Sequence, residues 1–92
     1  MQRKYRSRIG ILYDILVVIF KSDMPTITSI VMDANIPHNR LKKIIANLIK
    51  KGYIEELETA GMVIYKLTPE GYKLMKELEK LKKLLKGLGL AI

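Results

Sequence analysis

The segment TSIVMDANIPHNRLKKIIANLIKKGY, residues 28–53, decides the fold of this 92-residue chain. It opens with a short apolar stretch that ends at Asn35, a residue type that tolerates a left-handed backbone conformation. Pro37 follows, and its fixed φ suits the first position of a helix. Apolar residues then recur at helical spacing as far as Gly52, which is placed to end the helix. The segment therefore predicts two helices, about 29–34 and 37–51, joined by a tight turn.

A further helix is predicted on the N-terminal side, over about residues 6–21. Its polar strip holds only Gly10, Asp14 and Lys21, and apolar residues cover most of the rest of the wheel. Such a wide apolar arc has to be buried on two sides, one against the domain's own core and the other against a second helix or a partner chain. Between this helix and the next, residues 26–28 predict a short extended segment, with Thr28 or Ser29 as the following N-cap.

On the C-terminal side the hydrophobic period changes to that of strands. Residues 53–57 and 62–67 predict a hairpin with a loop at 58–61. Thr68 and Pro69 then predict the start of a last helix that runs to about residue 86. Its leucines are spaced four, three, four and three residues apart, which is the pattern of a coiled-coil seam. These leucines are Leu74, Leu78, Leu81, Leu85 and Leu88.

The order of these elements predicts an α+β fold that is mostly α, the winged helix-turn-helix. It consists of a three-helix core and a two-stranded wing, here followed by a C-terminal coiled-coil helix. We expect residues 1–68 to form the winged-helix domain with a basic N-terminal arm, and residues 69–92 to form a dimerisation helix. In this fold class the third helix enters the major groove of DNA and the wing flanks it.

The net charge of the chain limits the kinds of partner that the protein can bind. The chain has 17 Lys and Arg against 9 Asp and Glu, a formal net charge of +8, which attracts phosphate polyanions or an anionic membrane surface. The apolar run at residues 9–20 is too short to span a bilayer and contains Asp14, so a core helix in a cytoplasmic, nucleoid-associated protein is expected and no membrane partner.

Catalytic chemistry is not expected from this sequence. It has no Cys and a single His, which exclude thiolate metal sites and a His-based triad. It also lacks a Gly-rich phosphate loop and paired carboxylates in a predicted pocket. We therefore expect no enzyme, no catalytic residue, no metal, no cofactor and no small-molecule substrate.

The third helix carries the candidate DNA contacts on the face opposite its apolar stripe. No acidic residue lies between Asn35 and Tyr53, and Ala46 would allow close approach to a groove. Asn and Arg make bidentate contacts with base edges, and Lys neutralises phosphates. A merely solvated helix face is the alternative, and the acid-free run favours DNA contact. The candidates are Asn39, Arg40, Lys42, Lys43, Asn47 and Lys50.

Other basic residues have more than one interpretation. The N-terminal arm, with Arg3, Lys4, Arg6 and Arg8, fits a segment that tracks a DNA groove and fits a solubility tail equally well. For His38, a solvated surface position is favoured over a phosphate contact. The lysines that flank the leucine seam are expected to form a solvated face.

The sequence resembles the small archaeal "10a" winged-helix chromatin proteins. The similarity covers the basic arm at 3–8, the helix and turn at 28–40, the segment 41–52, and the junction Tyr65, Leu67, Thr68, Pro69, Glu70 and Gly71. It implies a dimer that binds double-stranded DNA and is joined through its C-terminal helices. The seam here spans only about two and a half repeats. The wing carries Glu55, Glu56 and Glu58, with Lys66 as its only base, which departs from a phosphate-binding wing.

The sequence leaves two alternatives open for the role of the leucine seam and two for the function. For the homodimer, we expect the five seam leucines to form the interface and Tyr13 and Phe20 of the first helix to widen it, because two heptads alone bury little. The other possibility is that these leucines cover only the first helix of the same chain. For function, the rival to DNA binding in chromatin or transcription regulation is a winged helix that serves only as a protein interaction module.

Overall fold

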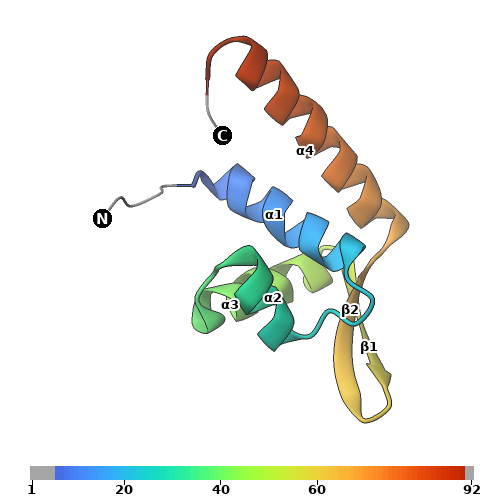
Figure 1. Ribbon diagram of the computed structural model, residues 1–92. Helices are drawn as coiled ribbons and strands as arrows, with labels where there is room; N and C mark the ends of the chain where they lie inside the picture. Colours follow the sequence, from blue (N-terminus) through green and yellow to red (C-terminus); the bar gives the residue numbers. More distant parts are fainter. Residues whose placement is uncertain (1–5, 91–92) are drawn as a thin grey trace.

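The computed structural model describes residues 6–90, and Figure 1 shows their arrangement. The elements are α1 (Arg8–Lys21), α2 (Ile27–Ala34), α3 (His38–Lys50), β1 (Ile54–Thr59), β2 (Met62–Leu67) and α4 (Pro69–Gly87). Helices α1 and α4 lie side by side, α2 and α3 pack beneath α1, and the β1–β2 hairpin projects away from the helices (Figure 1). The expected fold class, mostly helical with a two-stranded wing and a C-terminal helix, is confirmed.

The first two helices begin where a hydroxyl group caps them. The Gly10 amide donates to the Ser7 hydroxyl at 2.9 Å, so α1 starts two residues later than expected. At α2, the Ser29 amide donates to the Thr26 hydroxyl at 3.1 Å, and the Thr26 amide donates to the Ser29 hydroxyl at 2.9 Å. This reciprocal capping box starts α2 at Ile27. The predictions of an extended segment at 26–28 and of Thr28 or Ser29 as the N-cap were therefore wrong.

The turn between α2 and α3 has the backbone that its residues predict. Asn35 lies in the left-handed region with φ 54°. Pro37 is the N-cap of α3, so the helix begins at His38, one residue later than expected. At the other end of α3, Gly52 has φ 82° and the Tyr53 amide donates to the Leu48 carbonyl at 2.9 Å. This left-handed glycine ends the helix and turns the chain into the hairpin.

The hairpin has a two-residue loop, shorter than the loop at 58–61 that the sequence predicted. Ala60 and Gly61 both have positive φ, 51° and 73°, which is the backbone of a type I′ turn. The strands extend to Thr59 on one side of the loop and begin at Met62 on the other. The Tyr65 amide also donates to the Pro25 carbonyl at 3.0 Å, so the wing is tied to the α1–α2 connection.

Helix α1 is the centre of the core. Its residues Ile15 and Leu16 have no exposed surface, and α1 contacts α2, β2 and α4. The expectation that α1 is buried on two sides is confirmed, and α4 of the same chain provides the second side. Each such fully buried aliphatic side chain contributes about 1.5–3 kcal/mol relative to exposure. Within residues 6–90, no helix is both long enough and apolar enough to cross a membrane.

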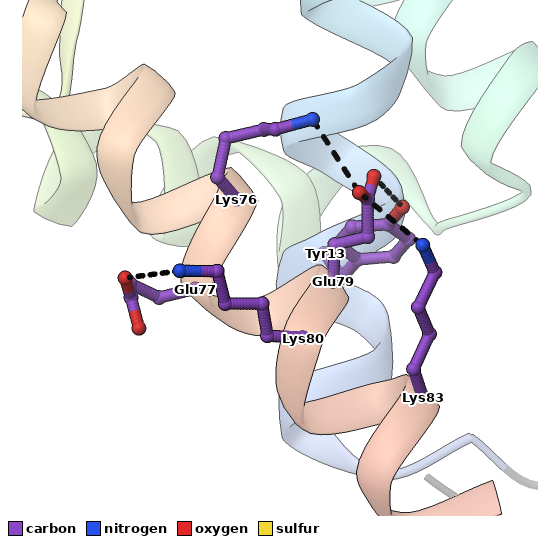
Figure 2. A network of polar contacts seen from close by, with 6 residues as sticks. All are labelled: Tyr13, Lys76, Glu77, Glu79, Lys80 and Lys83. Carbon is purple, nitrogen blue, oxygen red and sulfur yellow. Dashed lines mark hydrogen bonds and ion pairs between the residues drawn. The ribbon is translucent and has the colours of Figure 1, made fainter.

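A polar cluster fastens α4 to α1 (Figure 2). The Tyr13 hydroxyl donates to Glu79 Oε2 at 3.4 Å, while Lys76 and Lys83 approach Glu79 Oε1 at 3.4 and 3.9 Å. Partial burial raises the pKa of Tyr13, and the negative charge of Glu79 raises it further. The hydrogen bond from Lys76 lowers the pKa of Glu79. The Tyr13 hydroxyl therefore stays protonated and Glu79 stays ionised across the neutral pH range.

The junction before α4 links three elements through Thr68. Its hydroxyl donates to the Gly52 carbonyl at 2.6 Å and accepts from the Gly71 amide at 3.0 Å, and its own amide donates to the Tyr53 carbonyl at 3.1 Å. Gly71 is buried directly on the Tyr53 carbonyl, where a Cβ atom would collide with backbone. The first turn of α4 is thus held on the end of α3.

We predict that Gly71→Ala destabilises the protein by about 1–3 kcal/mol or more, because the new methyl group forces the backbone of α4 away from Tyr53. Gly87→Ala is the matched control. It lies at the other end of α4, where a Cβ would meet nothing, and should stabilise by up to about 1 kcal/mol. Urea denaturation measures both. Equal stability of the two variants would contradict the close approach at Gly71.

Candidate nucleic-acid interface

Helix α3 separates its apolar and polar residues onto opposite faces. Leu41, Ile45 and Leu48 are buried in the core, and Ala46 is exposed on the outer face. At about 100° per residue the outer face spans an arc of about 160°. The six candidate contacts all lie on it with exposed side chains, namely Asn39, Arg40, Lys42, Lys43, Asn47 and Lys50. The structure therefore brings these residues together on one surface.

The outer face of α3 has two flanks. Asn39, Lys42 and Lys50 form one flank, and none of them lines the groove beside α3. The other flank includes Arg40, Lys43 and Asn47, and these residues line a groove with residues of α1, α4 and the α3–β1 connection. Arg8 of α1 also lines this groove. Lys51 also lines it and was not among the predicted contacts, although it belongs to the same acid-free run.

The basic residues of α3 differ from those of α4 in how they are paired. Within residues 6–90, no ion pair involves any of the basic residues of α3. On α4, by contrast, lysines pair with glutamates of the same helix at distances of 3.4–3.9 Å. These are Lys73, Lys76, Lys80 and Lys83. In the part of the chain that the structure describes, Arg40, Lys42, Lys43 and Lys50 of α3 therefore carry charge without an ion-pair partner, as do Lys82 and Lys86 of α4.

Arg6 of the basic arm is engaged within the protein. Its guanidinium donates to Asp14 Oδ2 at 2.8 Å and to the Asn35 carbonyl at 2.8 Å. It thus connects the start of α1 to the turn before α3. This role was not predicted from the sequence, and Asp14 in the otherwise apolar α1 was the signal for it. Arg3 and Lys4 lie outside the described residues.

The wing offers little positive charge. Glu55, Glu56 and Glu58 are all exposed on β1, and Lys66 of β2 is paired in register with Glu55. Tyr65 is buried beneath the hairpin, and this burial raises its pKa, with Glu56 adding to the effect. The exposed edge of the wing is therefore acidic. On α3, the first residue, His38, is exposed.

The leucine seam of α4 is divided between the core and solvent. Leu78 is buried, whereas Leu88 is 67% exposed. Leu84, outside the predicted seam, is 61% exposed on the same side as Leu88. The other seam leucines are half-buried, which are Leu74, Leu81 and Leu85. A single chain thus covers only part of the apolar surface of α4.

The two residues of α1 expected beside this seam already contact α4 of the same chain. Tyr13 is half-buried against Glu79, and Lys82 Nζ lies 4.7 Å from the centroid of its ring. Phe20 is 53% exposed, and its ring centroid lies 5.3 Å from that of Tyr72. Phe20 therefore keeps accessible surface for a further contact, whereas Lys82 covers part of the Tyr13 ring.

Comparison with known proteins agrees with this architecture. Residues 5–86 match the family model described as winged helix-turn-helix. The chain belongs to the winged helix-turn-helix family. No curated protein matches the sequence of this winged-helix chain.

Several solved structures share the fold of this winged-helix protein. Sso10a-2, a DNA-binding protein from Sulfolobus solfataricus, is 25% identical with a TM-score of 0.79, over 90% of this chain and 85% of that one. The oxidized form of MarR from E. coli is 21% identical with a TM-score of 0.71, over 78% and 53% of the two chains. ZitR of Lactococcus lactis is 19% identical with a TM-score of 0.68, over 97% and 67%. The similarity to Sso10a-2 confirms the expected resemblance to the archaeal 10a proteins.

We predict that Arg6→Ala and Asp14→Asn each destabilise the protein by about 0.2–1 kcal/mol, the range of half-exposed ion pairs. Because the two residues share one contact, the double variant should lose less stability than the sum of the two single variants. Urea denaturation of the four proteins measures this coupling. Strictly additive effects would show that the ion pair of Arg6 with Asp14 does not contribute to stability.

Proposed function

We propose that this protein binds double-stranded DNA as a homodimer, with α3 in the major groove. The exposed, acid-free face of α3 is the observation that carries this proposal. Asn39, Arg40 and Asn47 present groups suited to base edges, and the lysines of the same face are suited to phosphates. The small side chain of Ala46 leaves room for the helix to approach the bases. The description of Sso10a-2 as a DNA-binding protein supports the same function.

The basic arm extends this interface in the proposal. Arg8 is exposed beside α3, where it can reach a phosphate, and Arg3 and Lys4 supply further charge for the backbone or an adjacent groove. Arg6 acts indirectly, because its contact with the Asn35 carbonyl holds the turn that orients α3. The acidic wing is not assigned a phosphate contact.

The dimer is proposed to form through residues 69–92. The exposed Leu84 and Leu88 and the half-exposed Leu74, Leu81 and Leu85 supply its apolar surface, and the buried Leu78 supports it from the core. Tyr13 and Phe20 of α1 widen the contact in this proposal. Two linked domains hold one duplex more tightly than a single domain does. The protein then acts at the nucleoid, in chromatin architecture or transcription regulation. These roles differ in specificity, which affinities for several unrelated duplexes would separate.

We predict that duplex DNA binds with an affinity that falls steeply with salt. The slope of log K against log salt should be near −0.9 per phosphate neutralised. Arg40→Ala combined with Lys43→Ala should weaken binding by about 1–3 kcal/mol for each side chain that reads a base edge, and less for one that binds a phosphate. Folding should be intact, because both side chains are exposed. Fluorescence anisotropy over a series of salt concentrations measures affinity and slope together.

The control for net charge is Lys73→Ala with Lys80→Ala, which removes two exposed cations from α4 instead of α3. This variant should retain most of the affinity of the parent protein. Similar losses of affinity in both variants would show that charge alone, and not the face of α3, governs binding. A parent protein that does not bind DNA at low salt would leave the protein interaction module as the better function.

We predict that the parent chain is dimeric at tens of micromolar, and that Leu84→Glu with Leu88→Glu makes it monomeric. Both side chains are mostly exposed in the single chain, so the substitution spares the fold while it places like charges in a symmetric contact. The variant should also bind DNA more weakly. Sedimentation equilibrium measures the association, and a monomeric parent at this concentration would refute the interface.

A further inference from the structure

The groove beside α3 has a volume of about 690 Å³, within the range of small-molecule sites. The residues that line the groove are of two kinds, apolar or aromatic residues at its floor and cationic residues at its rim. The floor is apolar or aromatic and includes Leu12, Ile44, Tyr53 and Leu74, all of which keep accessible surface. The rim is cationic and consists of Arg8, Arg40, Lys43 and Lys51. Within residues 6–90, no carboxylate lines the groove and none of these four cations has an ion-pair partner.

A groove with an apolar floor and a cationic rim favours a ligand that has both an apolar group and a negative charge. Accessible apolar surface gains about 25 cal/mol per Å² when it is covered, which requires a hydrocarbon or aromatic group. Four like charges around one opening repel each other, and an anion at the rim relieves that repulsion. A DNA phosphate satisfies the rim but has no apolar group for the floor. A neutral hydrocarbon covers the floor but leaves the rim charges unpaired.

A second copy of α4 is a poor occupant of the same groove. Its exposed Leu84 and Leu88 lie among Lys83 and Lys86, which would bring more positive charge to the cationic rim. Charge complementarity therefore favours a small molecule with one anionic group and a hydrocarbon body. We propose that the groove binds a small amphipathic anion, of the class of medium-chain carboxylates. Its carboxylate lies at the rim cations and its hydrocarbon chain lies along Leu12, Ile44 and Tyr53.

Such a ligand would regulate DNA binding, a consequence that rests on the proposed function. Arg40, Lys43 and Asn47 line the groove and are also proposed DNA contacts. A carboxylate at the rim occupies these cations, and the ligand and the duplex then compete. The apparent Kd for DNA should rise by the factor 1 + [ligand]/Kd of the ligand, as simple competition requires.

Decanoate is the probe, and its binding is measured first without DNA, by titration calorimetry and by amide chemical shifts. We expect saturable binding of one decanoate per chain, with the largest shifts at the groove residues. Decyltrimethylammonium has the same chain length and the opposite charge, and it should not bind at the same concentrations. Binding of both probes with similar affinity, or of neither, would overturn the proposal.

Substitutions at Ile44, Ile49 and Lys51 test whether decanoate binds in the groove. Ile44→Phe enlarges a floor residue and should weaken decanoate binding at least tenfold. Ile49→Phe is the matched control, because Ile49 is also half-buried on α3 but lies outside the groove, and it should bind decanoate as the parent does. Lys51→Gln removes one rim charge outside the core and should weaken binding severalfold, so the test stands even if Ile44→Phe does not fold. Unchanged affinity in both groove variants would place the ligand elsewhere.

The competition is measured last, with a fluorescent duplex at low salt. Decanoate should weaken DNA binding of the parent and of Ile49→Phe, and should have much less effect on Ile44→Phe. If the parent does not bind DNA in the absence of decanoate, the proposed function fails while the direct titration still decides the site. If decanoate binds in the groove but leaves the DNA affinity unchanged, the regulatory step is refuted.

Discussion

The contact between Gly71 and the Tyr53 carbonyl is the constraint on which the arrangement of the molecule depends. A helix can begin this close to another stretch of backbone only where no Cβ intervenes, and Thr68 secures the approach with hydrogen bonds to Gly52, Tyr53 and Gly71. The end of α3 and the start of α4 are thereby fixed to each other. The orientation of the basic face relative to the exposed leucines of α4 follows from this junction.

Helix α1 holds the other elements of the domain in position relative to the α3–α4 junction. Its fully buried residues Ile15 and Leu16 pack in the core that it shares with α2, β2 and α4, so displacement of any of these elements would open the core. The pairing of Tyr13 with Glu79 adds a polar fastening on the α4 side. Arg6 connects the start of α1 to the turn before α3. The basic face is therefore held by a frame that includes the wing, because Ile54 of β1 and Tyr65 of β2 are buried in the same core.

Local signals in the sequence predicted most of the secondary structure, and they failed where two signals competed. Asn35 and Gly52 end their helices as expected, because few residues other than Asn and Gly adopt a left-handed backbone readily. At residues 26–28, β-branched composition suggested an extended segment, but the capping box of Thr26 and Ser29 satisfies the free amides and extends α2 instead. The hairpin loop was predicted to include residues 58 and 59, which in the structure pair with β2 as the end of β1. The loop is shorter because Ala60 and Gly61 both adopt positive φ angles and make the turn by themselves.

The sequence by itself determined the winged helix-turn-helix order and the membership of the polar face of α3, because helical periodicity assigns each residue to a face without reference to the rest of the chain. Only the tertiary structure decided how the charges are paired. It placed Arg6 against Asp14 and Asn35, and it gathered Arg8 and Lys51 around one groove. It also divided the leucine seam between core and solvent. These outcomes depend on distances between residues far apart in the chain. The packing of α1 against α2 and α4 and of α2 against α3 sets these distances, and periodicity does not.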